Sequence, residues 1–258
     1  MSPREAHTFR AQAVVLRHFE YGEADRILTL FTLERGKIKA IAKGVRKIAS
    51  RKAGHLEPIT QCSLFFAKGH DLSIITQAET INAFLKIKEN LALTGQAAYV
   101  IELLERFTYE EGENRDLYNL LVDTLVRLEE NPFPRTVIHY YEVRLLDLLG
   151  FRPDLQNCTV CGKEITAQDQ YFYAHGGGAA CPACGRAQTD AWAITMPALK
   201  YFRHFQRSRY SQIKTLAIPA DVEKELGLLI EKYMTYLLER SLNTPRFIRD
   251  ISRPYQAN

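Results

Sequence analysis

Hydrophobic and polar residues alternate along the first eighty positions of the chain. Apolar side chains occupy every second position from Phe9 to Val15, and the runs ILTLFTL, KIKAIAK, CSLFFA and LSIIT follow. A period of two is typical of half-buried strands, and the turns between these runs read EYGEAD, Gly36 and KGHD. Five short strands without a helical repeat predict a small closed barrel.

From about Asn90 the apolar residues recur every three or four positions, which predicts helices. Local capping signals place the ends of several of them. Asn114 is expected to be the N-cap of a helix over 116–130. A third helix is expected to start at Pro134 and to end at the C-cap glycine Gly150, and two later helices are expected to start at Pro197 and at Asp221.

The change of period predicts an α+β chain. Residues 1–80 are expected to form a five-stranded barrel of the oligonucleotide-binding (OB) type. Residues 81–258 are expected to form an all-helical domain that carries a four-cysteine zinc knuckle module at about residues 155–190.

The zinc prediction comes from two Cys-x-x-Cys pairs, CTVCG and CPACG, with nineteen residues between them. Two such turns facing each other complete a tetrahedron of thiolates, and four sulfur ligands leave no open position for catalysis. The spacing therefore predicts one structural Zn²⁺ per chain. Gly162 and Gly185 follow the two pairs, where positive φ is expected. The predicted ligands are Cys158, Cys161, Cys181 and Cys184.

The same cysteines could instead form two disulfides or remain free thiols. Zinc is favoured because the amino terminus, MSPREAHTFR, lacks the apolar core of a signal peptide, so a reducing cytoplasmic location is expected. No apolar run reaches membrane-spanning length. His175 is an alternative ligand but is more simply a loop residue, and Cys62 is expected to be a buried small hydrophobe.

The net charge of +4 is unevenly distributed along the chain, with a basic N-terminal segment followed by an acidic central segment. Residues 1–80 carry thirteen Lys or Arg against eight acids, and residues 81–157 carry eight against thirteen. Eight cations lie within residues 35–52 without one acid, and on a strand Lys37, Lys39 and Lys43 would share one face and form a row. Such a row matches a phosphate backbone in charge and repeat, and the alternative is a solvated basic loop without a ligand. The candidate DNA-binding residues are Arg35, Lys37, Lys39, Lys43, Arg46, Lys47, Arg51 and Lys52.

A second basic stretch, KYFRHFQRSR, interleaves cations with aromatic residues. It is a candidate second nucleic-acid patch, a groove for an acidic peptide, or a solvated helix face. Its cations are Lys200, Arg203, Arg207 and Arg209. The chain has no phosphate-binding loop, no G-x-S-x-G elbow and no H-E-x-x-H motif, so no enzymatic activity is expected.

Two longer segments carry a family resemblance. VVLRHFEYGEADRILTLFTLERGKIKAIAKGVRK resembles the opening barrel of the bacterial recombination mediator family RecO, and LLGFRPDLQNCTVCG resembles the stretch that leads into its zinc knuckles. The resemblance covers the whole chain in order.

The resemblance implies a non-enzymatic DNA repair and recombination factor in the cytoplasm, associated with the nucleoid. Such proteins bind single- and double-stranded DNA, anneal complementary strands and bind the C-terminal tail of single-stranded-DNA-binding protein (SSB). Together with RecR they help to load RecA onto coated single strands. Two other readings of the residues stay open: a zinc-containing protein adaptor without DNA binding, and a zinc-dependent enzyme acting on nucleic acid.

Overall fold

The structure is a computed structural model that describes residues 8–109, 112–130 and 134–238. These residues divide into two compact units, with the boundary after Glu130. Among the described residues no helix combines the length and the apolar character needed to cross a lipid bilayer.

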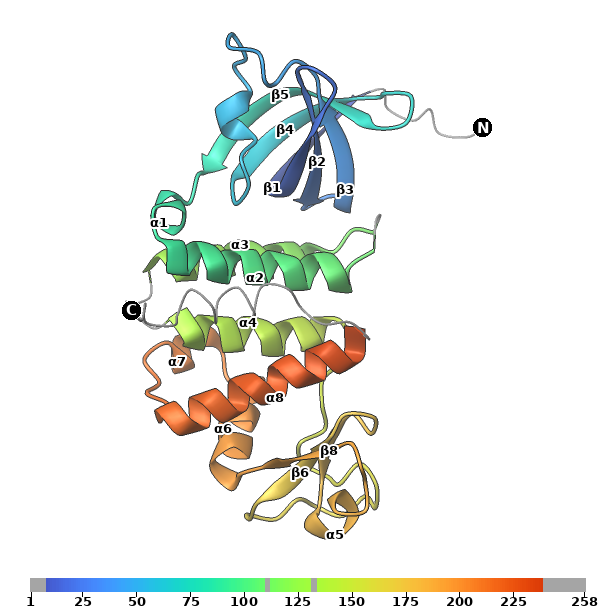
Figure 1. Cartoon of the computed structure of the whole chain (residues 1–258), viewed down its shortest axis with the longest axis vertical. Coiled ribbons are helices and arrows are strands. Elements are labelled where there is room, and N and C mark those ends of the chain that lie inside the picture. The colour runs from blue at the N-terminus through green and yellow to red at the C-terminus, as the bar shows by residue number, and fades with distance from the viewer. Residues whose placement is uncertain (1–7, 110–111, 131–133, 239–258) are drawn as a thin grey trace, which may run out of the picture. The chain divides into compact units, whose positions relative to one another are not determined.

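The first unit begins with five strands that close into a barrel in the order β1-β2-β3-β5-β4 (Figure 1). A parallel pairing between β3 and β5 joins the two antiparallel runs, and β1 also pairs with β4. The predicted five-stranded barrel is therefore confirmed. The strands are β1 (Thr8–Tyr21), β2 (Asp25–Thr32), β3 (Gly36–Ala42), β4 (Gln61–Ala67) and β5 (Ser73–Asn82), with a short 3-10 turn at Ala53–His55.

Alternate side chains of these strands fill the barrel. Ala11, Ala13 and Val15 point inward from β1 and pack with Leu28 and Leu30 of β2. Gln12 is exposed between Ala11 and Ala13, but Val14 is buried as well, and β2 is buried at every position from Ile27 to Thr32. The period of two that was read from the sequence therefore matches burial only in the first half of β1. Phe31 is also buried, as expected of a core residue.

Three helices complete the first unit: α1 (Leu85–Lys88), α2 (Leu91–Phe107) and α3 (Arg115–Glu130). The Asn90 side chain accepts hydrogen bonds from Ala92 N and Leu93 N at the start of α2. Asn114 Oδ1 accepts from Leu117 N at 3.0 Å, which confirms the predicted cap of α3.

The second unit contains α4 (Pro134–Leu148), α6 (Met196–Arg207), α7 (Tyr210–Ile213) and α8 (Ala220–Leu238). Gly150 ends α4 with a φ of 80°, and Phe151 N donates to Leu146 O at 2.8 Å, as expected of a C-cap glycine. The prediction that Asp221 caps α8 is wrong by two residues, because α8 begins at Ala220, so that residue 219 is the N-cap and Asp221 lies in the first turn.

The second unit is not all-helical, which corrects the predicted fold class. Three short antiparallel strands form a sheet in the order β7-β6-β8, and the one-turn helix α5 (Pro182–Gly185) lies between β7 and β8 in the sequence. The strands are β6 (Gln170–Tyr173), β7 (Gly178–Ala180) and β8 (Ala191–Ile194). Such short strands give no usable alternation in sequence.

Candidate nucleic-acid surface and candidate metal centre

The cations of residues 35–52 lie on β3 and on the loop that follows it, but they do not form the single row that strand geometry suggested. β3 ends at Ala42, so Lys43 belongs to the loop instead of continuing the face of Lys37 and Lys39. Ile38, which lies between these two lysines, and Ala40, which follows them, pack in the barrel core.

Lys37 reaches from β3 to the carboxyl end of α2. Its Nζ donates to Glu105 O at 2.6 Å and also to Thr108 O. The last carbonyls of a helix lack intrahelical donors and carry partial negative charge, so an ammonium group there stabilises the helix end. Lys37 therefore joins the barrel to α2, and Arg17 of β1 adds an ion pair with Glu105 at 2.5 Å.

Two further cations of the predicted set hold their own loop. Arg46 forms an ion pair with Glu20 at 3.1 Å and donates to Glu23 O. Lys52 Nζ donates to Lys43 O and to Ile75 O, and its burial lowers the pKa of the ammonium group. Both side chains therefore attach the loop to the barrel.

The other cations of the set face solvent. Lys39, Lys43, Lys47 and Arg51 are all exposed. Two aromatic side chains of the β1–β2 hairpin, Phe19 and Tyr21, are also 46% and 54% exposed. Exposed cations beside exposed rings can contact phosphates and stack on bases, which is the general chemistry of single-strand binding.

The second basic stretch lies on α6 and just beyond it. Lys200, Arg207 and Arg209 are exposed, whereas Arg203 is half-buried. The aromatic residues between them, Phe202 and Phe205, are completely buried, so these two rings face the core and do not face a ligand.

Arg203 belongs to a set of side chains that hold the segment between α4 and the first cysteine pair. Tyr233 Oη donates to Phe151 O at 3.2 Å, Gln206 Nε2 to Pro153 O at 3.0 Å, and Arg203 Nε to Leu155 O at 2.8 Å. Three donors from α6 and α8 thus bind alternate carbonyls of LLGFRPDL. This segment is an ordered strap, because its carbonyls have specific partners.

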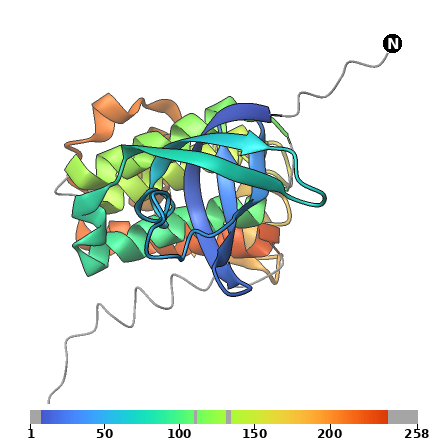
Figure 2. The same ribbon diagram turned by 90° about the horizontal axis from the view of Figure 1, so that it is seen from above.

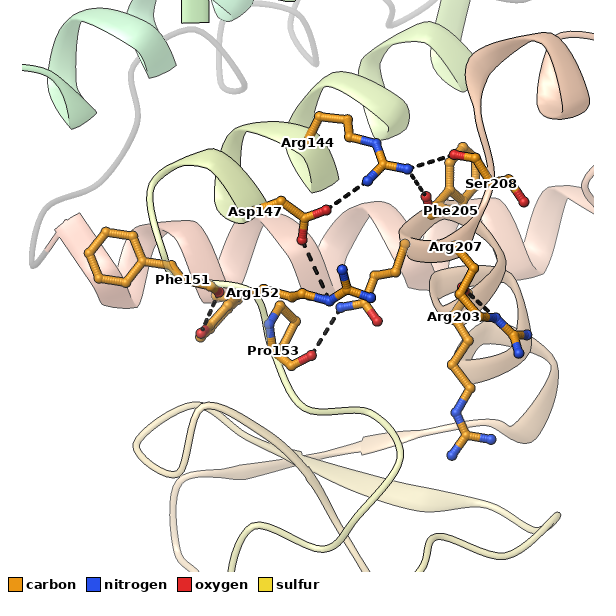
Figure 3. Close-up of polar contacts among 11 residues, drawn as sticks. Arg144, Asp147, Phe151, Arg152, Pro153, Arg203, Phe205, Arg207 and Ser208 are labelled. Carbon is orange, nitrogen blue, oxygen red and sulfur yellow. Dashed lines mark hydrogen bonds and ion pairs between the residues drawn. The ribbon is translucent and has the colours of Figure 1, made fainter. Parts of the chain in front are cut away.

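A carboxylate between two guanidinium groups fixes the beginning of this strap. Arg144 Nη1 donates to Asp147 at 2.8 Å, and Arg152 Nε lies 3.7 Å from the other Asp147 oxygen (Figure 3). Arg144 also donates to Ser208 O at 2.6 Å, beyond the end of α6. Burial raises the pKa of Asp147 despite the two arginines.

The strap leads directly to the four cysteines, which the fold brings together. The Sγ atoms of Cys158, Cys161, Cys181 and Cys184 all lie within 4.8 Å of one another. Cys158 N donates to Lys163 O and Cys181 N donates to Cys158 Sγ, so backbone hydrogen bonds shape both turns.

The two glycines that follow these turns have different roles. Gly162 has a φ of 73°, as expected for a tight turn after Cys161. Gly185 does not have positive φ, so that expectation is wrong; a Cβ there would lie 2.4 Å from the Tyr171 side chain. Close packing of α5 on β6 is the reason for glycine at this position.

The cysteine cluster fits a tetrahedral metal ion. A Zn–S distance of about 2.3 Å requires sulfur atoms about 3.8 Å apart, and Cys161 Sγ lies 3.9 Å from Cys181 Sγ. Burial of Cys158 opposes ionisation, but backbone N–H donors lower its pKa to about 6, while hydrogen bonds with the neighbouring thiols raise the pKa of Cys184 to about 12. All four cysteines can therefore be deprotonated together only when a bound cation compensates their negative charge.

Two other residues with metal-binding groups lie outside this cluster. His175 Nδ1 is 3.2 Å from Tyr236 Oη, and this histidine is not part of the four-cysteine group. Cys62 is buried in the barrel, and burial raises the pKa of its thiol to about 12, as expected for a small core residue.

Comparison with known proteins agrees with this organisation. The family model described as "Recombination protein O N terminal" matches residues 6–84, and the one described as "Recombination protein O C terminal" matches residues 88–246. The chain belongs to the RecO family. The resemblance noted in the sequence is thereby confirmed, and RecO family membership implies DNA repair and recombination.

Curated relatives of RecO type cover most of the chain. A "DNA repair protein RecO" from Dehalococcoides mccartyi is 35% identical over 91% of this chain and 92% of its own length. The RecO proteins of Roseiflexus sp. and Desulforamulus reducens are 33% and 30% identical over 94% and 97% of this chain, and over 86% and 96% of their own lengths.

Proposed function

We propose that this protein is a DNA repair and recombination mediator whose barrel, residues 1–80, is an OB fold that binds single- and double-stranded DNA. The observation that carries the proposal is the exposed, acid-free set of cations on β3 and the following loop. Phosphate neutralisation by such a set supplies most sequence-independent affinity for DNA. The contacting residues in the proposal are the exposed Arg35, Lys39, Lys43, Lys47 and Arg51, while Lys37, Arg46 and Lys52 hold β3 and the loop in place.

The proposed activity is annealing of complementary strands without catalysis. Two polyanionic strands repel each other, and a cationic surface reduces that repulsion when both are held close. Base pairing then provides the driving force, so neither ATP nor a catalytic base is needed. Annealing should weaken steeply with salt, because each neutralised phosphate contributes about −0.7 to the log–log slope on single strands.

The proposal includes protein partners. Residues 81–258 would bind the acidic C-terminal tail of SSB, and together with RecR the protein would help to load RecA on coated single strands in the cytoplasm. Exposed Lys200, Arg207 and Arg209 supply positive charge that suits an acidic tail.

The metal in this proposal is one Zn²⁺ per chain, held by Cys158, Cys161, Cys181 and Cys184. Its role is structural, because four thiolates fill the tetrahedron and leave no position for water or substrate. This coordination also argues against a zinc-dependent enzyme.

The decisive experiment reverses the charge of the three loop cations. The Lys43→Glu, Lys47→Glu, Arg51→Glu triple variant should bind single-stranded DNA more weakly, with a salt slope reduced by about 2, since three phosphate contacts of about 0.7 each are lost. Fluorescence anisotropy at several salt concentrations measures both quantities, and annealing is followed in parallel.

The matched control carries the same change of net charge elsewhere. Lys86→Glu, Lys163→Glu and Lys224→Glu alter exposed lysines outside the loop. If the control and the loop variant lose affinity equally, only net charge matters. If the folded loop variant binds and anneals as the wild type does, the adaptor reading replaces the proposal.

A further inference from the structure

The barrel of the first unit has a cavity at one end that the cationic loop does not explain. It has a volume of about 550 Å³ and lies among the β2–β3 turn, β3, the β4–β5 loop and the residues just before α3. Phe9, Ile38 and Leu72 contribute its apolar lining. The β4–β5 hairpin projects beyond the barrel (Figure 2). The volume falls in the range of small-ligand sites.

A stack of three side chains forms one wall of this cavity. The Phe9 ring lies on the buried Phe66 ring, with centroids 4.5 Å apart and an interplanar angle of 11°. The Arg35 guanidinium covers Phe9 at 3.6 Å from the ring centroid. Arginine guanidinium groups lie over aromatic rings and also stack on nucleobases, so Arg35 can take part in both contacts.

The rim of the cavity contains both signs of charge. Arg35, Lys37 and Lys39 line the cavity together with Glu34, Asp71 and Glu113. Three carboxylates disfavour a phosphate group. A nucleobase edge carries amino donors and carbonyl acceptors side by side, so it can pair with carboxylates and cations together.

We propose that this cavity, the barrel-mouth pocket, takes one unpaired nucleobase, which stacks on Arg35 while the backbone phosphates lie on the Lys43–Arg51 loop. A base in a duplex has its edge occupied and its faces stacked, so the pocket serves single strands only. This inference rests on the proposed DNA binding and adds base contact to it. It also gives Phe9, which the sequence marked only as a strand residue, the role of supporting the stack.

The test uses a variant that keeps the charge and removes the planar group. Arg35→Lys is compared with wild type for binding to a short deoxyadenylate strand and to an abasic strand of equal length. Stacking of one base contributes about 1–3 kcal/mol, so the ratio of base-bearing to abasic affinity should fall at least about fivefold. The salt slope should stay unchanged, because the number of cations is the same.

The chain offers a matched control in Arg51→Lys, the same chemical change at an exposed arginine outside the pocket. The control should keep the wild-type affinity ratio. An Arg35→Lys protein that binds DNA with an unaltered ratio would overturn the pocket and leave the proposed function intact. Wild-type protein that binds neither strand at low salt would overturn both.

Discussion

The barrel and the four-cysteine module reach stability by different routes. The barrel has a first strand of 14 residues, a closed hydrogen-bonded sheet and a continuous core of buried residues. The module has strands of four, three and four residues and brings four cysteines together. A large apolar core allows a fold to stand without a cross-link, whereas a small module needs a metal or a disulfide.

The module is also fastened to the helices of its own unit. Phe172 of β6 is completely buried, with its centroid 6.3 Å from that of Phe202 and 5.0 Å from that of Tyr233. The strap carbonyls bind donors from the same two helices. Arg144 and Arg203 of this unit therefore hold backbone carbonyls, while Lys43, Lys47 and Arg51 of the barrel loop face solvent.

The largest expected effect is on the module. Cys158→Ser should reduce zinc from about one ion per chain to almost none and lower the stability of the second unit by several kcal/mol, since metal binding and folding are coupled. Trp192, the one tryptophan of the chain, lies on β8 and reports unfolding of this unit by fluorescence.

Cys62→Ser is the matched control for this change, because it makes the same substitution in the barrel core. It should leave the zinc content and the Trp192 transition as in the wild type. A Cys158→Ser protein with an unshifted Trp192 transition would contradict the difference between the two regions.

The second-largest effect should be a difference in stability between variants of a strap-binding arginine and of an exposed arginine on α6. Arg203→Ala removes the donors to Leu155 O and should destabilise the second unit by about 2–3 kcal/mol, the usual range for a lost charged hydrogen bond. Exposed Arg207→Ala should change stability by less than about 0.5 kcal/mol. Chemical denaturation followed at Trp192 measures both; equal stability of the two variants would argue against the anchoring role.

A smaller effect distinguishes two lysines of the barrel. Lys37→Met should cost about 1–2 kcal/mol of stability, because it leaves carbonyls at the end of α2 without their donor. Lys43→Met should leave stability unchanged and lower the salt slope of DNA binding by about 0.7. Denaturation and anisotropy on both variants test this; the opposite pattern would exchange the roles assigned to the two residues.

The smallest effect concerns pH. Burial of Glu57 would raise its pKa, but hydrogen bonds from Arg26 and His18 lower it below the ordinary value. A carboxyl group whose pKa is lowered on folding stabilises the fold above its unfolded pKa of about 4.3, and this contribution is lost as pH falls through the folded value.

Glu57 is partly exposed, so its contribution should stay below about 1 kcal/mol. Glu57→Gln should therefore flatten the loss of barrel stability between about pH 6 and pH 3, measured by hydrogen exchange of β1 and β2. Glu79→Gln, which changes an exposed glutamate on β5, is the control and should leave the pH dependence of stability as in the wild type. A steeper loss in Glu57→Gln would reverse the sign of this contribution.

Sequence alone predicted what depends on local period and spacing. The alternation in β1, the cap at Asn114 and the cysteine spacing each specify their structure over a few residues. The role of Lys37 could not be read, because its partner carbonyl on Glu105 is 68 residues away. The three-stranded sheet was missed because its strands are shorter than a recognisable period.

The aromatic residues of α6 show the same limit. Phe202 and Phe205 alternate with cations in sequence, which suggests base stacking, yet a spacing of three places both on one helix face, and that face is buried. Which face of a helix meets the core is a tertiary property.

The most direct test is amide hydrogen exchange with and without a bound single strand of DNA. It shows whether the barrel binds the DNA while the four-cysteine module has only a structural role. The account predicts slower exchange in β3 and in residues 43–52, with no change across residues 158–184. Protection confined to the cysteine module and α6, with the barrel loop unaffected, would contradict it.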